Sequence, residues 1–121
     1  MTRARRAFLG IPLALLFAPR TALAHAILLR SNPQHDSTIH PGAIAVALVF
    51  NSRIDRSRSR LTLTAPGGRS TVIAIRDDST DAELRADASV DRLGAWKLRW
   101  QVLAADGHIT RGDVAFTVTA S

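Results

Sequence analysis

The sequence predicts an all-β fold, a seven-stranded antiparallel β-sandwich or barrel with Greek-key connections. Three observations predict it. Apolar residues recur with a period of two, turn residues separate the short runs, and no helical periodicity follows residue 24. The chain has 121 residues, and the part after residue 24 is long enough for one small domain. We therefore expect a single domain over residues 25–121.

Three runs show the clearest alternation along the chain. Residues 43–50 place their larger side chains on one face, and the runs at 96–103 and 114–119 alternate in the same way. We expect Trp96 and Trp100, which share a face, to lie in the core. Shorter strands are expected at 27–31, 60–65, 71–75 and 82–85. Asn32-Pro33, Pro41-Gly42 and Pro66-Gly67-Gly68 supply the turns, the last joining 60–65 to 71–75 as a hairpin.

Residues 1–24 have the features of a signal peptide. A basic segment at Arg3–Arg6 precedes an apolar stretch at 7–18, and Ala22–Ala24 offers the small residues that a signal peptidase reads. The segment Arg5–Leu9 resembles the twin-arginine export signal, and the general secretory route stays open. Either route predicts an exported protein, located outside the cytoplasm. Cleavage after Ala24 would make His25 the first residue and turn its backbone nitrogen into a primary amine.

Composition excludes several classes of function. The net charge of +6 overstates the basic character, because four arginines lie in the leader and all ten acidic residues follow it, so we expect no nucleic-acid partner. There is no cysteine and the only methionine is Met1, so a metal site in the mature chain must use nitrogen and oxygen ligands. The chain also lacks a nucleophile elbow and a glycine-rich phosphate loop.

Two of the four histidines carry the metal hypothesis. After cleavage, His25 would offer its amine and one ring nitrogen to a single ion. Asp106 and His108 would point the same way in extended backbone, and Gly107 between them would permit close approach. Three nitrogens and one carboxylate oxygen form the tetragonal set that Cu(II) prefers, and Zn(II) would accept it with lower affinity. If the strand at 27–31 lay antiparallel to the strand at 96–103, these residues would meet.

The same residues resemble the CopC-type periplasmic copper-binding and copper-resistance proteins. The start from His25 to Pro33 is similar to their pattern H-A-x-L-x-x-S-x-P. Later residues that fit the family are Trp100, Asp106-Gly107-His108, Gly112, Phe116 and Val118. The resemblance implies a Greek-key barrel or sandwich shaped like cupredoxins, and one Cu(II) ion held by His25, Asp106 and His108. It also implies a role in copper tolerance or supply, beside an inner-membrane CopD-like copper transporter.

The chain departs from the family pattern in two ways. Asn51 and Ser52 follow Phe50 where some members carry a carboxylate, and no methionine-rich Cu(I) site is available. We therefore expect a single-site, Cu(II)-only member.

The favoured function is an exported monomeric carrier or buffer of Cu(II), not an enzyme. Its affinity is expected to fall below about pH 6, because protons compete for the nitrogen ligands. Two alternatives stay open: a copper-brace oxidative enzyme of the monooxygenase type, and a metal-free immunoglobulin-like structural module. A second ion at His35 and His40 is disfavoured against a solvated loop, and the basic run at 53–60 is interpreted as a solvated face.

Overall fold

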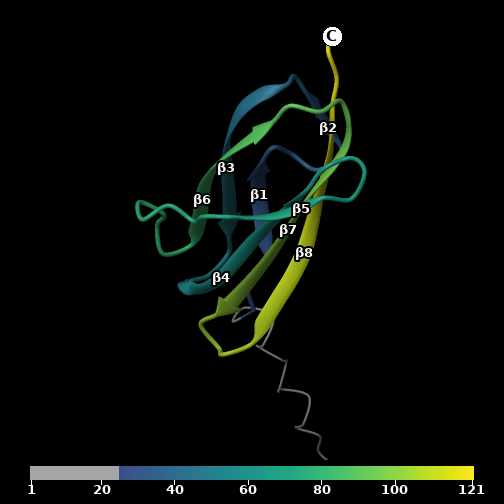
Figure 1. The fold of residues 1–121 in the computed structure, drawn as a ribbon. Helices are drawn as coiled ribbons and strands as arrows, with labels where there is room; N and C mark the ends of the chain where they lie inside the picture. The colour runs from purple at the N-terminus through teal and green to yellow at the C-terminus, as the bar shows by residue number, and fades with distance from the viewer. Residues whose placement is uncertain (1–24) are drawn as a thin grey trace, which may run out of the picture.

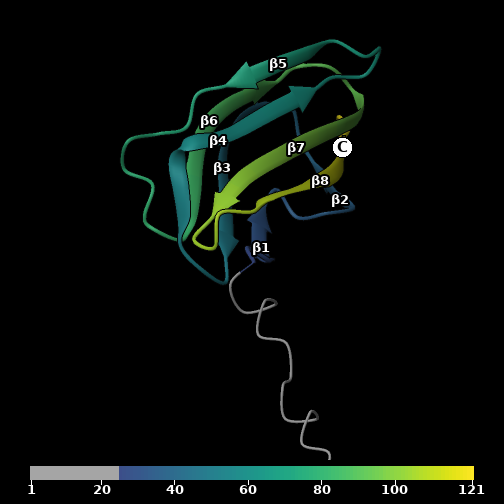
Figure 2. The same ribbon diagram turned by 90° about the horizontal axis from the view of Figure 1, so that it is seen from below.

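A computed structural model gives the fold of the protein and describes residues 25–121. These residues form two β-sheets packed face to face (Figures 1 and 2). The strands are β1 (Leu28–Asn32), β2 (Ser37–Ile39), β3 (Gly42–Phe50), β4 (Ile54–Thr64), β5 (Ser70–Ile73), β6 (Glu83–Val90), β7 (Gly94–Ala104) and β8 (Ile109–Val118). Within residues 25–121 there is no helix of the length and apolarity needed to cross a membrane.

The predicted all-β sandwich is confirmed, with eight strands in place of seven. One sheet has the order β1-β3-β6 and the other β2-β8-β7-β4-β5, and every pair is antiparallel except β2 with β8. The expected hairpin is present as β4 and β5, with positive φ angles at Gly67 and Gly68 in its turn. Residues 54–59 extend β4 at its start, and residues 86–90 extend β6 at its end, beyond the ranges that the sequence predicted.

The additional strand, β2, lies in a stretch that the sequence analysis assigned to a loop. It is three residues long and runs parallel to β8, with Ser37 opposite Phe116. The loop before it is fixed by two contacts with Ala115: its N–H donates to His35 Nδ1 at 3.0 Å, and its carbonyl accepts from the Asp36 N–H at 2.6 Å. Because β2 owes its place to a distant partner strand, its own residues show no clear alternation.

The core lies between the two sheets and is apolar throughout. Leu48, Leu61 and Leu98 are fully buried, and both tryptophans are 6% exposed, as predicted for Trp96 and Trp100. Trp100 packs edge-on against Phe50, with ring centroids 5.2 Å apart. This aromatic contact joins β3 to β7 across the core and helps to fix the position of one sheet on the other.

Charged side chains lie on the outer faces. Arg99 on β7 donates two hydrogen bonds to Asp113 on β8, at 2.9 and 3.1 Å, and this contact lowers the pKa of Asp113. The basic run at 53–60 covers the first residues of β4 and the residue before it, and the pairing of β4 with β7 is interrupted between Asp55 and Arg60. Arg56 binds the carbonyl of Asp77, and the arginines of this run are exposed, as expected for a solvated face.

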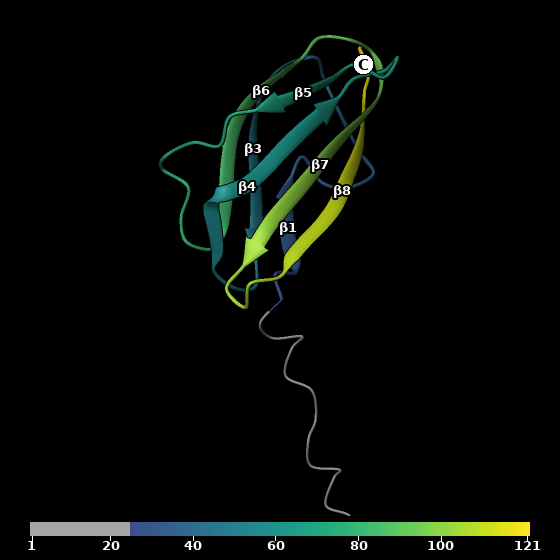
Figure 3. The same ribbon diagram turned by 60° about the horizontal axis from the view of Figure 1, so that its bottom comes forward.

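One end of the sandwich brings distant parts of the chain together. The start of β1 and the hairpin between β7 and β8 lie at the same end, which is the lower end in Figures 1 and 3. The expected pairing of strand 27–31 with strand 96–103 is wrong, because β1 is hydrogen-bonded to β3 in the opposite sheet. The two segments nevertheless meet, since the facing sheets end together.

Candidate metal centre

Three side chains that the sequence singled out converge at this end of the sandwich. His25 directs its Nδ1 at Asp106 Oδ2 over 2.6 Å, and His108 directs its own Nδ1 at the same oxygen over 3.0 Å. The two imidazole rings lie edge to face, with centroids 5.0 Å apart. The three candidate ligand atoms all lie within 4.8 Å of one another, a spacing that one metal ion can bridge. A contact across 81 positions of sequence therefore creates the cluster.

The tight hairpin between β7 and β8 presents two of these residues. Ala104 accepts a hydrogen bond from the Gly107 N–H and donates one to the His108 carbonyl, both at 2.9 Å. Gly107 has a φ of 86°, in the left-handed region that glycine adopts without steric cost. The extended backbone predicted at these positions is wrong, because residues 105–107 form a turn, and the turn itself aims Asp106 and His108 at each other.

The two oxygens of Asp106 have different partners. Oδ1 accepts a hydrogen bond from the His108 backbone N–H at 3.0 Å, which closes the turn locally. Oδ2 faces both imidazoles. The carboxylate therefore has one oxygen committed to the hairpin and one directed at the candidate site, which suits it to bind an ion through Oδ2 alone.

Hydrogen bonds keep Asp106 in its charged form. The pKa of Asp106 is lowered, chiefly by the backbone N–H of His108; burial is the next-largest effect and opposes it, and the contacts with the His108 and His25 rings lower the pKa further. A carboxylate with a lowered pKa stays anionic through the neutral range, so its charge is available to a cation. Two imidazoles and one anionic oxygen form a donor set that suits Cu(II) or Zn(II).

The segment carrying His25 is held by a short anchor. Ala26 is buried in the core at 1% exposure. Ile27 is joined to Asn51 by two hydrogen bonds: its N–H donates to Asn51 Oδ1 at 2.8 Å, and its carbonyl accepts from the Asn51 N–H at 3.0 Å. Sequence reasoning missed this role of Asn51. The only signal was its position directly after Phe50, where the chain leaves β3.

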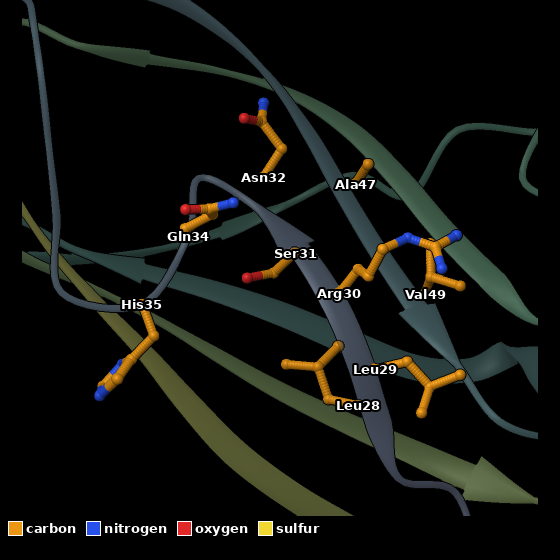
Figure 4. Close-up of a pocket in the computed structure, with 9 residues that line it drawn as sticks. All are labelled: Leu28, Leu29, Arg30, Ser31, Asn32, Gln34, His35, Ala47 and Val49. Carbon is orange, nitrogen blue, oxygen red and sulfur yellow. The ribbon is translucent and has the colours of Figure 1, made fainter.

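The cluster is open to solvent on one side. The side chain of Asp106 is 16% exposed, while those of His25 and His108 are 41% and 67% exposed. An ion can therefore reach the site from solution. A surface cavity of about 670 Å³ lies elsewhere, along β1 and the loop that follows it (Figure 4). His35 at the edge of that cavity is bound to the backbone of β8, and no metal-ligand cluster other than that of His25, Asp106 and His108 is found within residues 25–121.

Fold and cluster together define a class: small β-sandwich proteins with a cluster of histidine and carboxylate side chains at one end that could hold a metal ion. Residues 28–119 match the CopC domain family, so the chain belongs to that family, as the sequence resemblance predicted. A curated relative, the copper transport protein CutJ of Bacillus subtilis, is 24% identical over 115 residues. The match covers 88% of this chain and 20% of that protein, so this chain spans only about a fifth of its relative.

Solved structures show the same architecture. CopC from Methylosinus trichosporium OB3b superposes with a TM-score of 0.70 at 24% identity, covering 78% of this chain and 93% of that one. PcoC, a methionine-rich copper resistance protein from Escherichia coli, gives a TM-score of 0.58 at 23% identity and covers 79% of this chain and all of that one. These likenesses establish the fold. The present chain differs from PcoC in composition, because its only methionine is Met1.

Proposed function

We propose that this protein is an exported, periplasmic Cu(II)-binding protein that buffers or carries copper. The observation that carries the proposal is the convergence of His25, His108 and Asp106, whose candidate ligand atoms lie within 4.8 Å of one another and whose two Nδ1 atoms both face Asp106 Oδ2. Membership of the CopC family and the copper transport name of the relative CutJ support copper as the cargo. The leader at residues 1–24 lies outside the described residues, and its cleavage stays a prediction.

Cleavage before His25 would complete the ligand set. The ring atom that faces Asp106 is Nδ1, the imidazole nitrogen nearer the backbone. Nδ1 and the free amine of the same residue can close one chelate ring on a metal ion. Three nitrogens and Asp106 Oδ2 would then supply the donor set that Cu(II) prefers. Cu(I) is disfavoured, since no thiolate or thioether remains after residue 24.

The surroundings of the site favour a carrier over an oxidative enzyme. Within residues 25–121 the exposed large apolar side chains are aliphatic, and the two nearest to the ligands in sequence are Ile27 and Ile109. No exposed aromatic surface is therefore present there to hold a polysaccharide. A solvent-open site for one ion suits exchange of copper with a partner, for which we propose an inner-membrane CopD-like transporter. We propose that the carrier acts as a monomer.

Electron paramagnetic resonance of the protein beginning at His25, with one equivalent of Cu(II), tests the proposal. The expected spectrum is that of a tetragonal site with several nitrogen ligands. His108→Ala should weaken binding and change the hyperfine pattern. His40→Ala, at an exposed histidine outside the cluster, is the matched control and should leave the spectrum unchanged.

Processing is tested with one added residue before His25. This extended protein should bind Cu(II) more weakly, because the amine becomes an amide. Equal affinity of the extended and processed proteins would show that the amine is not a ligand. Copper-dependent turnover of polysaccharide would favour the enzyme alternative.

A further inference from the structure

We infer that Asn51 is a positioning residue for the metal site, acting through Ile27 to hold His25 against the hairpin. The inference rests on the proposed function and names a residue to which the ligand set gives no role. Asn51 lies directly after β3 and is exposed, so it does not serve the core. Its side-chain oxygen accepts the Ile27 N–H at 2.8 Å.

The bond replaces a missing rung of the β-ladder. Followed toward His25, the pairing of β1 with β3 passes a register shift between Arg30 and Leu28 and ends with Leu28 opposite Phe50. Beyond Phe50, Asn51 donates its backbone N–H to the Ile27 carbonyl at 3.0 Å. The reciprocal bond is made by the Asn51 side chain, so Ile27 is held by both its N–H and its carbonyl. The ladder is thereby extended one residue closer to His25.

The anchor matters because little else holds this end of the chain. After processing, His25 would be the terminal residue, and chain ends fray unless they are tied down. Apart from the contact of its own ring with Asp106, two features tie it: the burial of Ala26 at 1% exposure and the paired hydrogen bonds of Ile27. A ligand that is already in place loses less conformational entropy when the ion binds. Loss of the side-chain bond should therefore weaken copper binding without removing a ligand.

The opposite end of the same strand pair offers a matched control. Asn32, the last residue of β1, donates its side-chain amide to the Ala45 carbonyl of β3 at 2.6 Å. Asn32 and Asn51 are both exposed asparagines, and each makes one side-chain hydrogen bond at an end of the β1–β3 pair. Only Asn51 lies beside the segment that carries His25. Alanine substitutions at the two sites should have similar effects on stability and different effects on copper.

The experiment compares Asn51→Ala, Asn32→Ala and unsubstituted protein, each beginning at His25. Competition titration with a chelator should show a Cu(II) dissociation constant about three- to tenfold higher for Asn51→Ala, the range expected for one lost hydrogen bond. Asn32→Ala should stay within about twofold of the unsubstituted protein. Asn51→Asp, which keeps an oxygen acceptor, should bind Cu(II) no more weakly than the unsubstituted protein.

A metal-free measurement tests the anchor itself. Amide hydrogen exchange of Ile27 should be about fivefold or more faster in Asn51→Ala, and unchanged in Asn32→Ala. If the unsubstituted protein binds no Cu(II), the proposed function and this inference both fail. If it binds Cu(II) and Asn51→Ala matches its affinity, or if Asn32→Ala weakens binding equally, only the positioning role of Asn51 is overturned.

Discussion

Replacement of Gly112 by alanine is expected to destabilise the protein by about 2–3 kcal/mol. Gly112 lies on β8 opposite the buried Trp100 of β7 and is itself half-buried. A Cβ atom at this position would lie 2.4 Å from Trp100 Cζ2, 2.7 Å from Cε2 and 3.0 Å from Nε1. The φ angle of Gly112 is not in the positive range, so alanine suits the local backbone and the steric clash alone decides the outcome.

The indole cannot move aside cheaply. Trp100 is 6% exposed and packs against Phe50 with centroids 5.2 Å apart, so a shift of its ring would displace the other sheet. Either the tryptophan leaves its rotamer or β8 moves away from β7, and both responses disturb a close-packed core. Overpacking by one methyl group typically costs about 1–3 kcal/mol, and the number of close contacts here favours the upper part of that range.

Urea and thermal denaturation of the metal-free protein measure this effect. A loss of about 2–3 kcal/mol should lower the Tm by about 10–20 °C in a domain of this size. The matched background is Trp100→Phe, which removes the indole atoms that the new methyl would meet. In that background Gly112→Ala should cost less than about 1 kcal/mol. Unchanged stability of Gly112→Ala, or an equal loss in both backgrounds, would refute the steric reasoning.

Three further outcomes are expected. Asp113→Asn should lower the free energy of unfolding at pH 7 by about 0.2–1 kcal/mol. Because the pKa of Asp113 is lowered in the folded protein, its stabilising effect is present above about pH 4 and is lost as the pH falls through the folded-state pKa, so denaturation at acid pH should show no difference between the two proteins. Asp106→Asn should raise the Cu(II) dissociation constant at least about tenfold in competition titrations. The asparagine Oδ1 can still accept the His108 N–H, so the circular dichroism spectrum should be unchanged. Undiminished affinity would exclude this carboxylate as a ligand. His35→Ala should lower the free energy of unfolding in urea by about 0.5–1.5 kcal/mol, because the Ala115 N–H loses its acceptor. A lower copper stoichiometry in this variant would instead support a second ion site.

The sequence predicted the strands whose alternation reflects burial between two sheets. Residues 43–50 and 96–103 alternate because one face of each strand meets the core, and the structure buries Leu48 and Leu98 as that pattern requires. The pattern failed where burial is incomplete. The first half of β4 carries arginines at exposed positions, and β2 depends on pairing with β8, so neither segment shows an alternation of apolar residues. Local sequence could not show strands that a distant partner determines.

The candidate site, too, was predictable from the sequence only in part. The residue types of His25, Asp106 and His108, and the exclusion of sulfur ligands, follow from the sequence alone. The geometry does not, since the turn at Gly107 aims Asp106 and His108, and the extended backbone assumed for them is absent. The sequence also did not predict the contact of Asn51 with Ile27, because a hydrogen bond between residues 24 positions apart produces no periodic sequence pattern.

The sequence by itself determined the fold class, the family and the chemistry of the available donors, because periodicity, turn residues and composition are local properties. Tertiary structure alone decided which sheet receives β1 and that both sheets end where His25 meets the β7–β8 hairpin. It also decided that one oxygen of Asp106 faces both rings while the other closes the turn. The physical reason is that strand pairing and the packing of facing sheets are non-local, and their free energy is gained only when segments far apart in the chain meet.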